Sequence, residues 1–410
     1  MNKVKTLTLE NGLQIIISKN KKNRSTAHIY IKAGGMNTKF KVDNKEIEVP
    51  YGTAHFLEHY LIEQSIYGNA GEMFGNDYII SNGITSRHTT EFFIRTVHDF
   101  EENLMKLLNI VNNPDFDRDI EQVKNPIIQE IRRARDRQGR LFDKSIFESV
   151  TKTRIHDTIL GEVETIKNMD KETLKKFHEA FYQPNNQILV LTGNIKDKTI
   201  EKIKEFYKGK KNKNVQKHEY EEQDNVIYNK KEIVDETIRE NLLEITYKIN
   251  VKKYTPDEKN RIDYYIHYLF DAKYNEKGKL FNYLIDNKLT LYAIETDLDP
   301  RTIKDYMFVT IRVYTGEFEK VTELLQKELN IENLIEENFK KWQNKEIIKK
   351  FCSQENPEYE AQNLVNNMLL YDLHEYDTLE FVKSLNLKEA KKLLGGLNYS
   401  NYTILINKEK

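Results

Sequence analysis

Short apolar runs with two different spacings alternate along this chain, which predicts a mixture of strands and helices. Near the start, Leu7 to Leu9 and Leu13 to Ser18 flank Asn11 and Gly12, a dipeptide that favours positive φ in a tight turn. A third run, Thr26 to Ala33, has the same strand-like composition. The chain is therefore expected to open with a β-hairpin and a third strand.

Strand-like and helix-like segments continue to alternate after this opening. Asn82 to Val97 is rich in Thr, Ile and Phe and reads as one or two strands. Helical spacing is found from Phe100 to Asn112, from Asp117 to about Arg137 and from Lys171 to Tyr182, before a strand at Gln187 to Thr192. This exchange of strands and helices predicts the α+β class.

A polar stretch divides the chain into two parts. Residues 208–224 are dense in Lys, Asn, Glu and Gln, which is typical of a solvated linker between domains, here 1–207 and 225–410. The second part replays the order of the first: strands near 242–250, a helix near 256–272, strands to Val313, then helices. We therefore expect two homologous α/β-sandwich domains in tandem, produced by duplication.

Composition excludes several classes of partner and site. The chain has 410 residues, with 64 Lys and Arg against 65 Asp and Glu, so no net field favours nucleic acid or an anionic membrane. Its one cysteine, Cys352, excludes a metal site built on several thiolates. The start lacks the apolar block of a secretory signal, and no run approaches the roughly 18 apolar residues of a membrane span. A cytoplasmic protein is expected.

The run His55-Phe56-Leu57-Glu58-His59 carries the clearest chemistry. It should lie on a helix, with Thr53 able to cap its start and an end near Gln64. Residues three and four apart share one helical face, so both imidazoles can reach one zinc ion and Glu58 can act as general base. The H-x-x-E-H order reverses the commoner zinc-peptidase motif. The competing interpretation is a helix that carries these three residues by chance.

The residues around this run resemble the pitrilysin or insulinase family over roughly 7–196. The resemblance covers Gly52 to His59, the opening Leu9-Glu10-Asn11-Gly12-Leu13, the strand Asn82-Gly83-Ile84-Thr85-Ser86, and the segment from Phe177 to Ile195. It is weaker beyond that segment. The family implies one zinc per chain and a peptide that binds as an extended strand, with Asn82 and Thr85 as substrate-binding residues.

The family also implies a glutamate as third zinc ligand, on a later helix. Glu130, within Pro126 to Ile131, matches that position, and Glu121 is the fallback. Many relatives carry a second glutamate seven residues before the ligand, but Val123 stands there. A carboxylate beyond the ligands is therefore missing or is supplied by another residue.

The second domain departs from the family pattern. Relatives often place an Arg and a Tyr seven residues apart there, where they bind the substrate backbone and stabilise the tetrahedral intermediate. Tyr292 matches the Tyr, but Ile285 occupies the Arg position. This favours a heterodimer whose other subunit carries the Arg and Tyr. A misalignment, with Arg301 or Arg312 as the missing residue, and a homodimer remain alternatives.

These expectations combine into a zinc-dependent endopeptidase that cuts extended or small peptides. The two domains would form half of a clamshell, with Glu58 as base and Tyr292 or a partner residue assisting the oxyanion. One alternative is a non-catalytic subunit that binds peptides or acts as a scaffold. Another is an enzyme dedicated to the maturation of a single peptide.

Overall fold

The chain divides into two compact units in the computed structural model, which describes residues 3–20, 24–135, 138–152, 159–220, 222–275, 278–371 and 378–410. Unit 1 comprises Met1–Ala134, Ile155–Tyr220 and Cys352–Leu369. Unit 2 comprises Arg135–Arg154, Glu221–Phe351 and Leu370–Lys410. Each unit combines a β-sheet with helices, so the predicted α+β class is confirmed.

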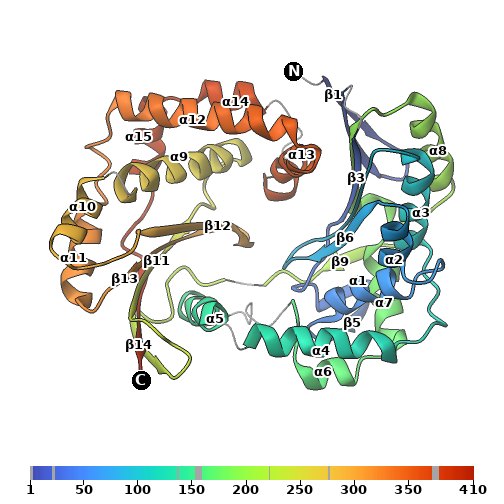
Figure 1. Ribbon diagram of the computed structural model, residues 1–410, viewed down its shortest axis with the longest axis horizontal. Helices are drawn as coiled ribbons and strands as arrows, with labels where there is room; N and C mark the ends of the chain where they lie inside the picture. Colours follow the sequence, from blue (N-terminus) through green and yellow to red (C-terminus); the bar gives the residue numbers. More distant parts are fainter. Residues whose placement is uncertain are drawn as a thin grey trace. The chain divides into compact units, whose positions relative to one another are not determined.

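Unit 1 is built on a six-stranded sheet in the order β1-β2-β8-β3-β7-β6 (Figure 1). Its strands are β1 Lys3–Thr8, β2 Gln14–Lys19, β3 Ser25–Ile31, β6 Ile80–Thr85, β7 Thr90–Thr96 and β8 Gln187–Gly193. β2 and β8 are parallel, and the other neighbours are antiparallel. The predicted hairpin of β1 and β2 is confirmed, with Gly12 at φ 86° in its turn.

Helices cover one face of this sheet and enclose the core of unit 1 with it. They are α1 Thr53–Glu63, α2 Ala70–Asn76, α3 Phe100–Asn112, α4 Glu121–Arg135, α6 Val163–Lys167, α7 Lys171–Phe181 and α8 Asp197–Tyr207, with a 3-10 turn at Pro184–Asn186. Along β3, Ala27, Ile29 and Ile31 join this core. Side chains alternate along a strand, so His28 and Tyr30 face the opposite side of the sheet.

A second, small sheet corrects the expectation that residues 208–224 form only a solvated linker. The Lys- and Asn-rich stretch before α1 forms the hairpin β4 Lys39–Val42 and β5 Lys45–Glu48, and β9 Val215–Lys217 pairs with β4 from inside the predicted linker. Phe40 is buried against the rings of Phe177 and Phe181 on α7. Phe40, with Val42, Ile47 and Val215 packed against the same core, thus anchors a segment whose composition resembles a loop.

Unit 2 repeats the strand order of unit 1 in a five-stranded sheet, β10-β14-β11-β13-β12. Its strands are β10 Lys230–Asp235, β11 Leu242–Asn250, β12 Glu295–Ile303, β13 Tyr306–Tyr314 and β14 Tyr402–Glu409. The parallel pair β10 and β14 corresponds to β2 and β8, and the antiparallel strands follow in the same order. This shared topology is what the predicted duplication requires.

The helices of unit 2 enclose a separate apolar core. They are α9 Pro256–Tyr274, α10 Lys279–Asp286, α11 Phe318–Glu328, α12 Glu336–Glu355, α14 Thr378–Ser384 and α15 Leu387–Gly395. A further helix, α5 Gln138–Val150, packs in a different small cluster. α15 leads into β14 as α7 leads into β8 in unit 1. The similar stretches Leu174-Lys175-Lys176-Phe177 and Ala390-Lys391-Lys392-Leu393 therefore lie on equivalent helices.

The predicted division at a single linker needs correction, because each unit includes a helix from the other part of the sequence. α5 belongs to unit 2, where Phe142 packs with Ile238 and Leu242. α13, Pro357–Tyr371, belongs almost entirely to unit 1 and lies on the sheet face opposite α3 (Figure 1). There Glu358 pairs with Arg95 at 2.7 Å. The chain therefore crosses between units more than once.

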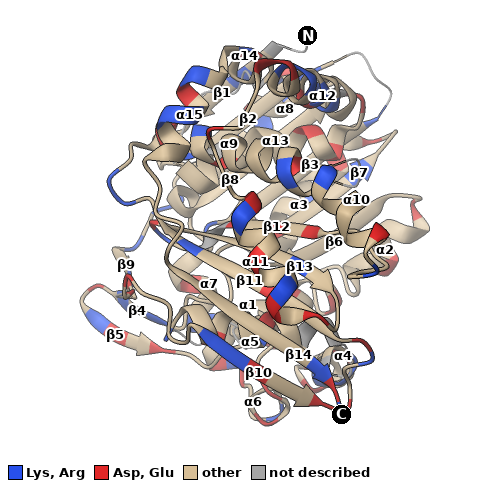
Figure 2. Cartoon of the chain, turned by 90° about the vertical axis from the view of Figure 1, so that its left-hand side faces the viewer, with Lys and Arg blue, Asp and Glu red and all other residues tan. Residues whose placement is uncertain are grey.

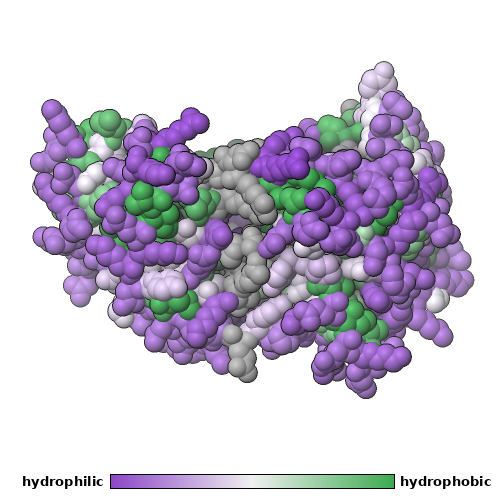
Figure 3. All heavy atoms as spheres, turned by 90° about the horizontal axis from the view of Figure 1, so that it is seen from below, coloured by the Kyte–Doolittle hydropathy of each residue, from purple (hydrophilic) through white to green (hydrophobic). Residues whose placement is uncertain are grey.

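The surface agrees with the balanced composition. Acidic and basic residues are interspersed along the elements (Figure 2), and hydrophilic residues dominate the face shown in Figure 3, where apolar patches are separate from one another. Every helix in the described segments is too short or too polar to span a bilayer.

Candidate metal centre

The local fold places α1 against a loop that borders the site. Gly52 adopts φ 88° immediately before the helix, and a Cβ there would lie 2.9 Å from the carbonyl oxygen of Leu160. Glycine is needed for both the conformation and this close approach. The predicted cap at Thr53 is wrong, because its hydroxyl donates to the carbonyl of Pro50 at 2.7 Å.

Burial holds α1 rigidly. Most of its side chains are buried, and the Tyr60 hydroxyl donates to the carbonyls of Asp115 and Arg118, which lie just before α4. These bonds link the motif helix to the chain segment that leads into the helix carrying Glu130. A site assembled from α1 and α4 therefore rests on packed elements rather than on loops.

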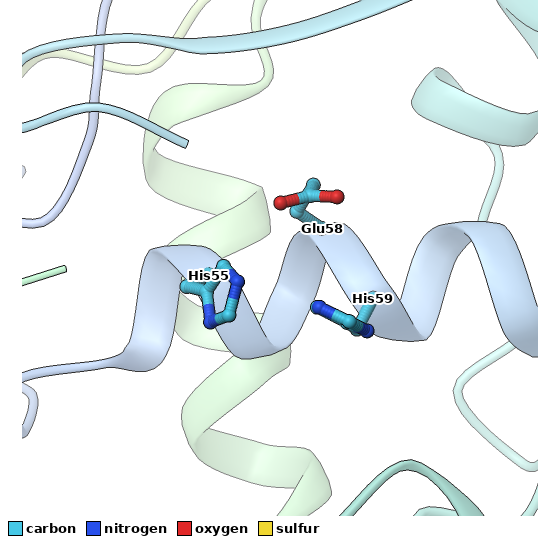
Figure 4. A group of neighbouring side chains, drawn as sticks. All are labelled: His55, Glu58 and His59. Carbon is cyan, nitrogen blue, oxygen red and sulfur yellow. The ribbon is translucent and has the colours of Figure 1, made fainter. Parts of the chain in front are cut away.

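Three side chains of the motif lie together on α1. The metal-binding atoms of His55, Glu58 and His59 are within 4.8 Å of one another, and Figure 4 shows them leaving adjacent turns of the helix. They border a cavity of about 420 Å³, which is also lined by Ile62, Glu63, Asn82, Gly83, Ile84, Thr85, Glu130, Ile159 and Leu160. The cavity combines convergent polar groups with apolar walls, as ligand sites commonly do.

The structure brings Glu130 from α4 to the two histidines. Its Oε2 lies 3.5 Å from Nε2 of His55 and 3.6 Å from Nε2 of His59. Tetrahedral zinc with ligands at about 2.1 Å separates neighbouring ligand atoms by about 3.4 Å. The observed separations match that edge length, so these three groups fit the His₂Glu donor set of a catalytic zinc site.

The fallback ligand Glu121 lies elsewhere. Its carboxylate pairs with Lys124 at 2.7 Å and is 70% exposed. Nine residues of helix separate it from Glu130, roughly 13 Å along the axis of α4. The geometry therefore favours Glu130 over Glu121.

The pKa values of His55, His59 and Glu130 indicate that these groups together favour a bound positive charge. Burial opposes the charged form of His59, but the carboxylates of Glu130 and Glu63 outweigh it and raise the pKa of His59 to about 10. Burial lowers the pKa of His55 to about 4, helped by the charge of His59. The pKa of Glu130 is lowered, chiefly by His59. A positive charge among these groups is thus favoured, which a metal ion also supplies.

Glu58 differs from Glu130 in its surroundings. Burial raises the pKa of Glu58 to about 7, although His59 and the Thr85 hydroxyl act in the opposite direction. The Thr85 hydroxyl donates to its Oε2 at 3.1 Å, and a Cβ on Gly83 would lie 2.3 Å from its Oε1. A carboxylate with a pKa near neutrality suits proton transfer, whereas Glu130 suits ligation.

The two residues expected to bind substrate lie on β6, the last strand of the unit 1 sheet. Asn82 is exposed, on the same face as Ile80 and Ile84, whereas Thr85 is directed toward Glu58. The role of Asn82 stays a prediction. For Thr85 the geometry adds a contact with Glu58 that the sequence did not suggest.

The residues expected to assist from the second domain lie in unit 2. Tyr292 is half-exposed, and its hydroxyl donates to Glu240 at 2.7 Å, while Ile285 lies on α10. Arg312 bonds the buried carboxylate of Glu244 at 2.8 Å, and the side chain of Arg301 lies outside the described residues. Arg312 is therefore engaged in a structural ion pair.

Sequence reasoning missed Glu63, which lines the cavity and accepts a hydrogen bond from His59. Its Oε1 lies 2.8 Å from Nδ1 of His59. The available signal was its position four residues after His59 on the same helix, the spacing at which helical side chains meet.

Part of the chain matches the sequence model of a known protein family. Residues 168–351 match the model described as the Peptidase M16 inactive domain. That range begins after Glu130 and lies wholly outside the motif on α1, so the word inactive does not refer to the part of the chain that carries the metal-binding residues.

Relatives and solved structures extend the comparison. The uncharacterized zinc protease YmfH of Bacillus subtilis is 29% identical over 234 residues, covering 55% of this chain and 54% of YmfH. The β subunit of the mitochondrial-processing peptidase of Dictyostelium discoideum is 24% identical, covering 52% of this chain and 45% of that subunit. The chain thus spans about half the length of these curated relatives. A crystal structure of a putative M16-like peptidase from Alicyclobacillus acidocaldarius has a TM-score of 0.87 at 17% identity, covering 100% of this chain and 99% of the other.

Proposed function

We propose that this chain, which belongs to the M16 family of peptidases and so to the pitrilysin or insulinase type, is the zinc-binding subunit of an endopeptidase. The observation that carries the proposal is the convergence of His55, His59 and Glu130 at tetrahedral edge distances, with Glu58 held beside them by Thr85. A metal site with a separate carboxylate base is the arrangement that hydrolytic zinc chemistry needs.

The residues of this chain divide the chemistry between them. A zinc ion supplies Lewis acidity and makes water acidic enough to lose a proton near neutral pH. His55, His59 and Glu130 would hold the ion, and three protein ligands would leave room for solvent or substrate. Glu58 removes the proton from the attacking water and passes it to the amine of the leaving peptide. Thr85 holds Glu58 for both transfers through its hydroxyl.

The shape of the site supports an extended substrate. β6 is the edge strand of the unit 1 sheet, and it lines the same cavity as the ligands through Asn82, Gly83, Ile84 and Thr85. A peptide paired with this edge would carry its main chain past the metal. Small or unfolded peptides can adopt that extended form, whereas the interior of a folded protein cannot.

Ile285 supports a partner subunit. No guanidinium occupies its place on α10, and Tyr292 is bonded to Glu240, so the oxyanion requires either a freed Tyr292 or a residue from another chain. The similarity to a β subunit of a processing peptidase points the same way. We infer a heterodimer with a homologous subunit that carries the Arg and Tyr, acting in the cytoplasm.

Metal removal tests the proposed activity. Chelation is expected to abolish cleavage of an unstructured peptide, and zinc added at one ion per chain is expected to restore it. Peptide products are measured by mass spectrometry. The control substrate is a folded protein that contains the same peptide sequence. Cleavage that continues after the zinc content has fallen to zero would contradict a metallopeptidase.

The alternative is a subunit that binds peptides without cutting them, because Ile285 leaves this chain without the arginine expected in its second domain. This alternative predicts that the zinc-loaded chain, with its native partner present, binds the same peptide without forming products. Such a result, together with stoichiometric zinc, would replace the catalytic proposal.

The subunit composition is a separate prediction. Purification of the tagged chain from its native source is expected to recover a second, homologous chain of similar mass that carries the Arg and Tyr. Mass spectrometry of the complex identifies it, and cleavage is expected to require both chains. Recovery of active complexes that contain only this chain would show a homodimer and contradict the heterodimer.

A further inference from the structure

Both ring nitrogens of His59 face a carboxylate. Nε2 lies 3.6 Å from Glu130 Oε2, on the metal side, and Nδ1 lies 2.8 Å from Glu63 Oε1 on the other side. We propose that Glu63 is a positioning residue that fixes the tautomer and orientation of His59 for metal binding. The proposal deepens the proposed function and rests on it, because it assigns the group that supports one of the three ligands.

The bond to Glu63 selects the ring form that a metal needs. A neutral imidazole has one N–H, and a carboxylate at Nδ1 keeps the proton on that nitrogen. Nε2 is then the nitrogen whose lone pair would bind a metal ion in place of a proton. A carboxylate behind a ligating histidine also makes the ring a stronger donor, and such outer partners tune metal affinity.

The position of Glu63 is unfavourable for the helix itself. It is the last residue of α1, where the negative end of the helix dipole opposes a carboxylate, and the last turn contains no basic residue to offset it. Its bond to His59 is the interaction that accounts for a partly buried acid at this end. The placement therefore points to a role at the site rather than in helix stability.

The two histidines are held by different means. The His55 side chain is 7% exposed, and its Nδ1 has no hydrogen-bond partner among the described groups, so packing holds the side of that ring turned away from Glu130. The His59 side chain is 23% exposed and has more room to rotate. A hydrogen bond is needed where packing is looser, which explains why only His59 has a carboxylate behind it.

Glu63→Leu tests the proposal through zinc affinity, measured by competition with a chelator on the folded chain. The variant is expected to bind zinc about 10- to 100-fold more weakly than the parent chain. Glu63→Gln keeps an acceptor for the Nδ1 proton and is expected to lose less. Glu121→Leu removes an exposed glutamate from α4 and is expected to leave the affinity unchanged.

Thermal unfolding of the metal-free proteins separates positioning from folding. The inference predicts that Glu63→Leu unfolds near the temperature of the parent chain while its zinc affinity falls. Equal zinc affinity in Glu63→Leu and the parent would overturn the inference and leave the proposed function standing. A parent chain that binds no zinc would overturn both.

Discussion

Replacing Glu58 by glutamine is expected to reduce peptide cleavage by about 10²- to 10⁴-fold while zinc remains bound, because general acid–base catalysis typically contributes a factor of that order. Glutamine has nearly the same shape and can accept the hydrogen bond that the Thr85 hydroxyl now gives to Glu58. It cannot take a proton from water. The loss should therefore fall on kcat, with little change in the fold or the metal.

The measurement pairs steady-state cleavage with the zinc content of the same preparation. Glu121→Gln is the matched control, since it makes the same chemical change at an exposed position on α4. Full activity in Glu58→Gln would exclude Glu58 as the base. If zinc were lost together with the activity, Glu58 would instead be a metal ligand. Its carboxylate lies within 4.8 Å of the metal-binding atoms of both histidines, so the geometry allows this alternative.

Local signals explain why much of the fold could be predicted. The Asn11-Gly12 turn, the strand at Leu242–Asn250 and the helix at Phe100–Asn112 were all expected from residues within each segment. Apolar periodicity decides such elements because it fixes the face that must be buried. The metal motif is equally local, since a helix alone brings His55, Glu58 and His59 together.

Distant contacts explain what the sequence did not show. The β4 to β5 hairpin has a local signal in Asp43 and Asn44, which both take positive φ in its turn, but its high charge disguised it. The third strand, β9, comes from Val215–Lys217, far along the chain. Amino-acid composition does not show that two segments so far apart pair as strands, so residues 208–224 resembled a linker.

The exchange of α5 and α13 between the units was invisible for a related reason. α13 follows α12 directly and reads as another helix of the second part. Its place in unit 1 depends on specific partners there, such as Arg95 for Glu358 and Ser18, whose hydroxyl donates to Glu360 at 2.5 Å. Periodicity reveals that a helix has a buried face but not which sheet covers it.

Replacing Glu130 by glutamine is expected to weaken zinc binding by more than the roughly 10- to 100-fold that the loss of an outer partner costs, because it removes a direct ligand. The neutral amide is a poor zinc ligand, and the two histidines alone leave the ion half-coordinated. Cleavage should fall with the zinc content. Chelator competition measures the affinity, and Glu121→Gln again controls for loss of a glutamate from α4.

Excess zinc distinguishes this variant from Glu58→Gln. A binding defect is relieved by mass action, so Glu130→Gln should regain part of its activity as the zinc concentration rises, whereas Glu58→Gln should not. If Glu130→Gln bound zinc as tightly as the parent chain, the 3.5 and 3.6 Å approaches of Glu130 to the histidines would be ion pairs of the metal-free site only. Glu58 would then be the remaining carboxylate within reach of both histidines, and the base would have to come from another group.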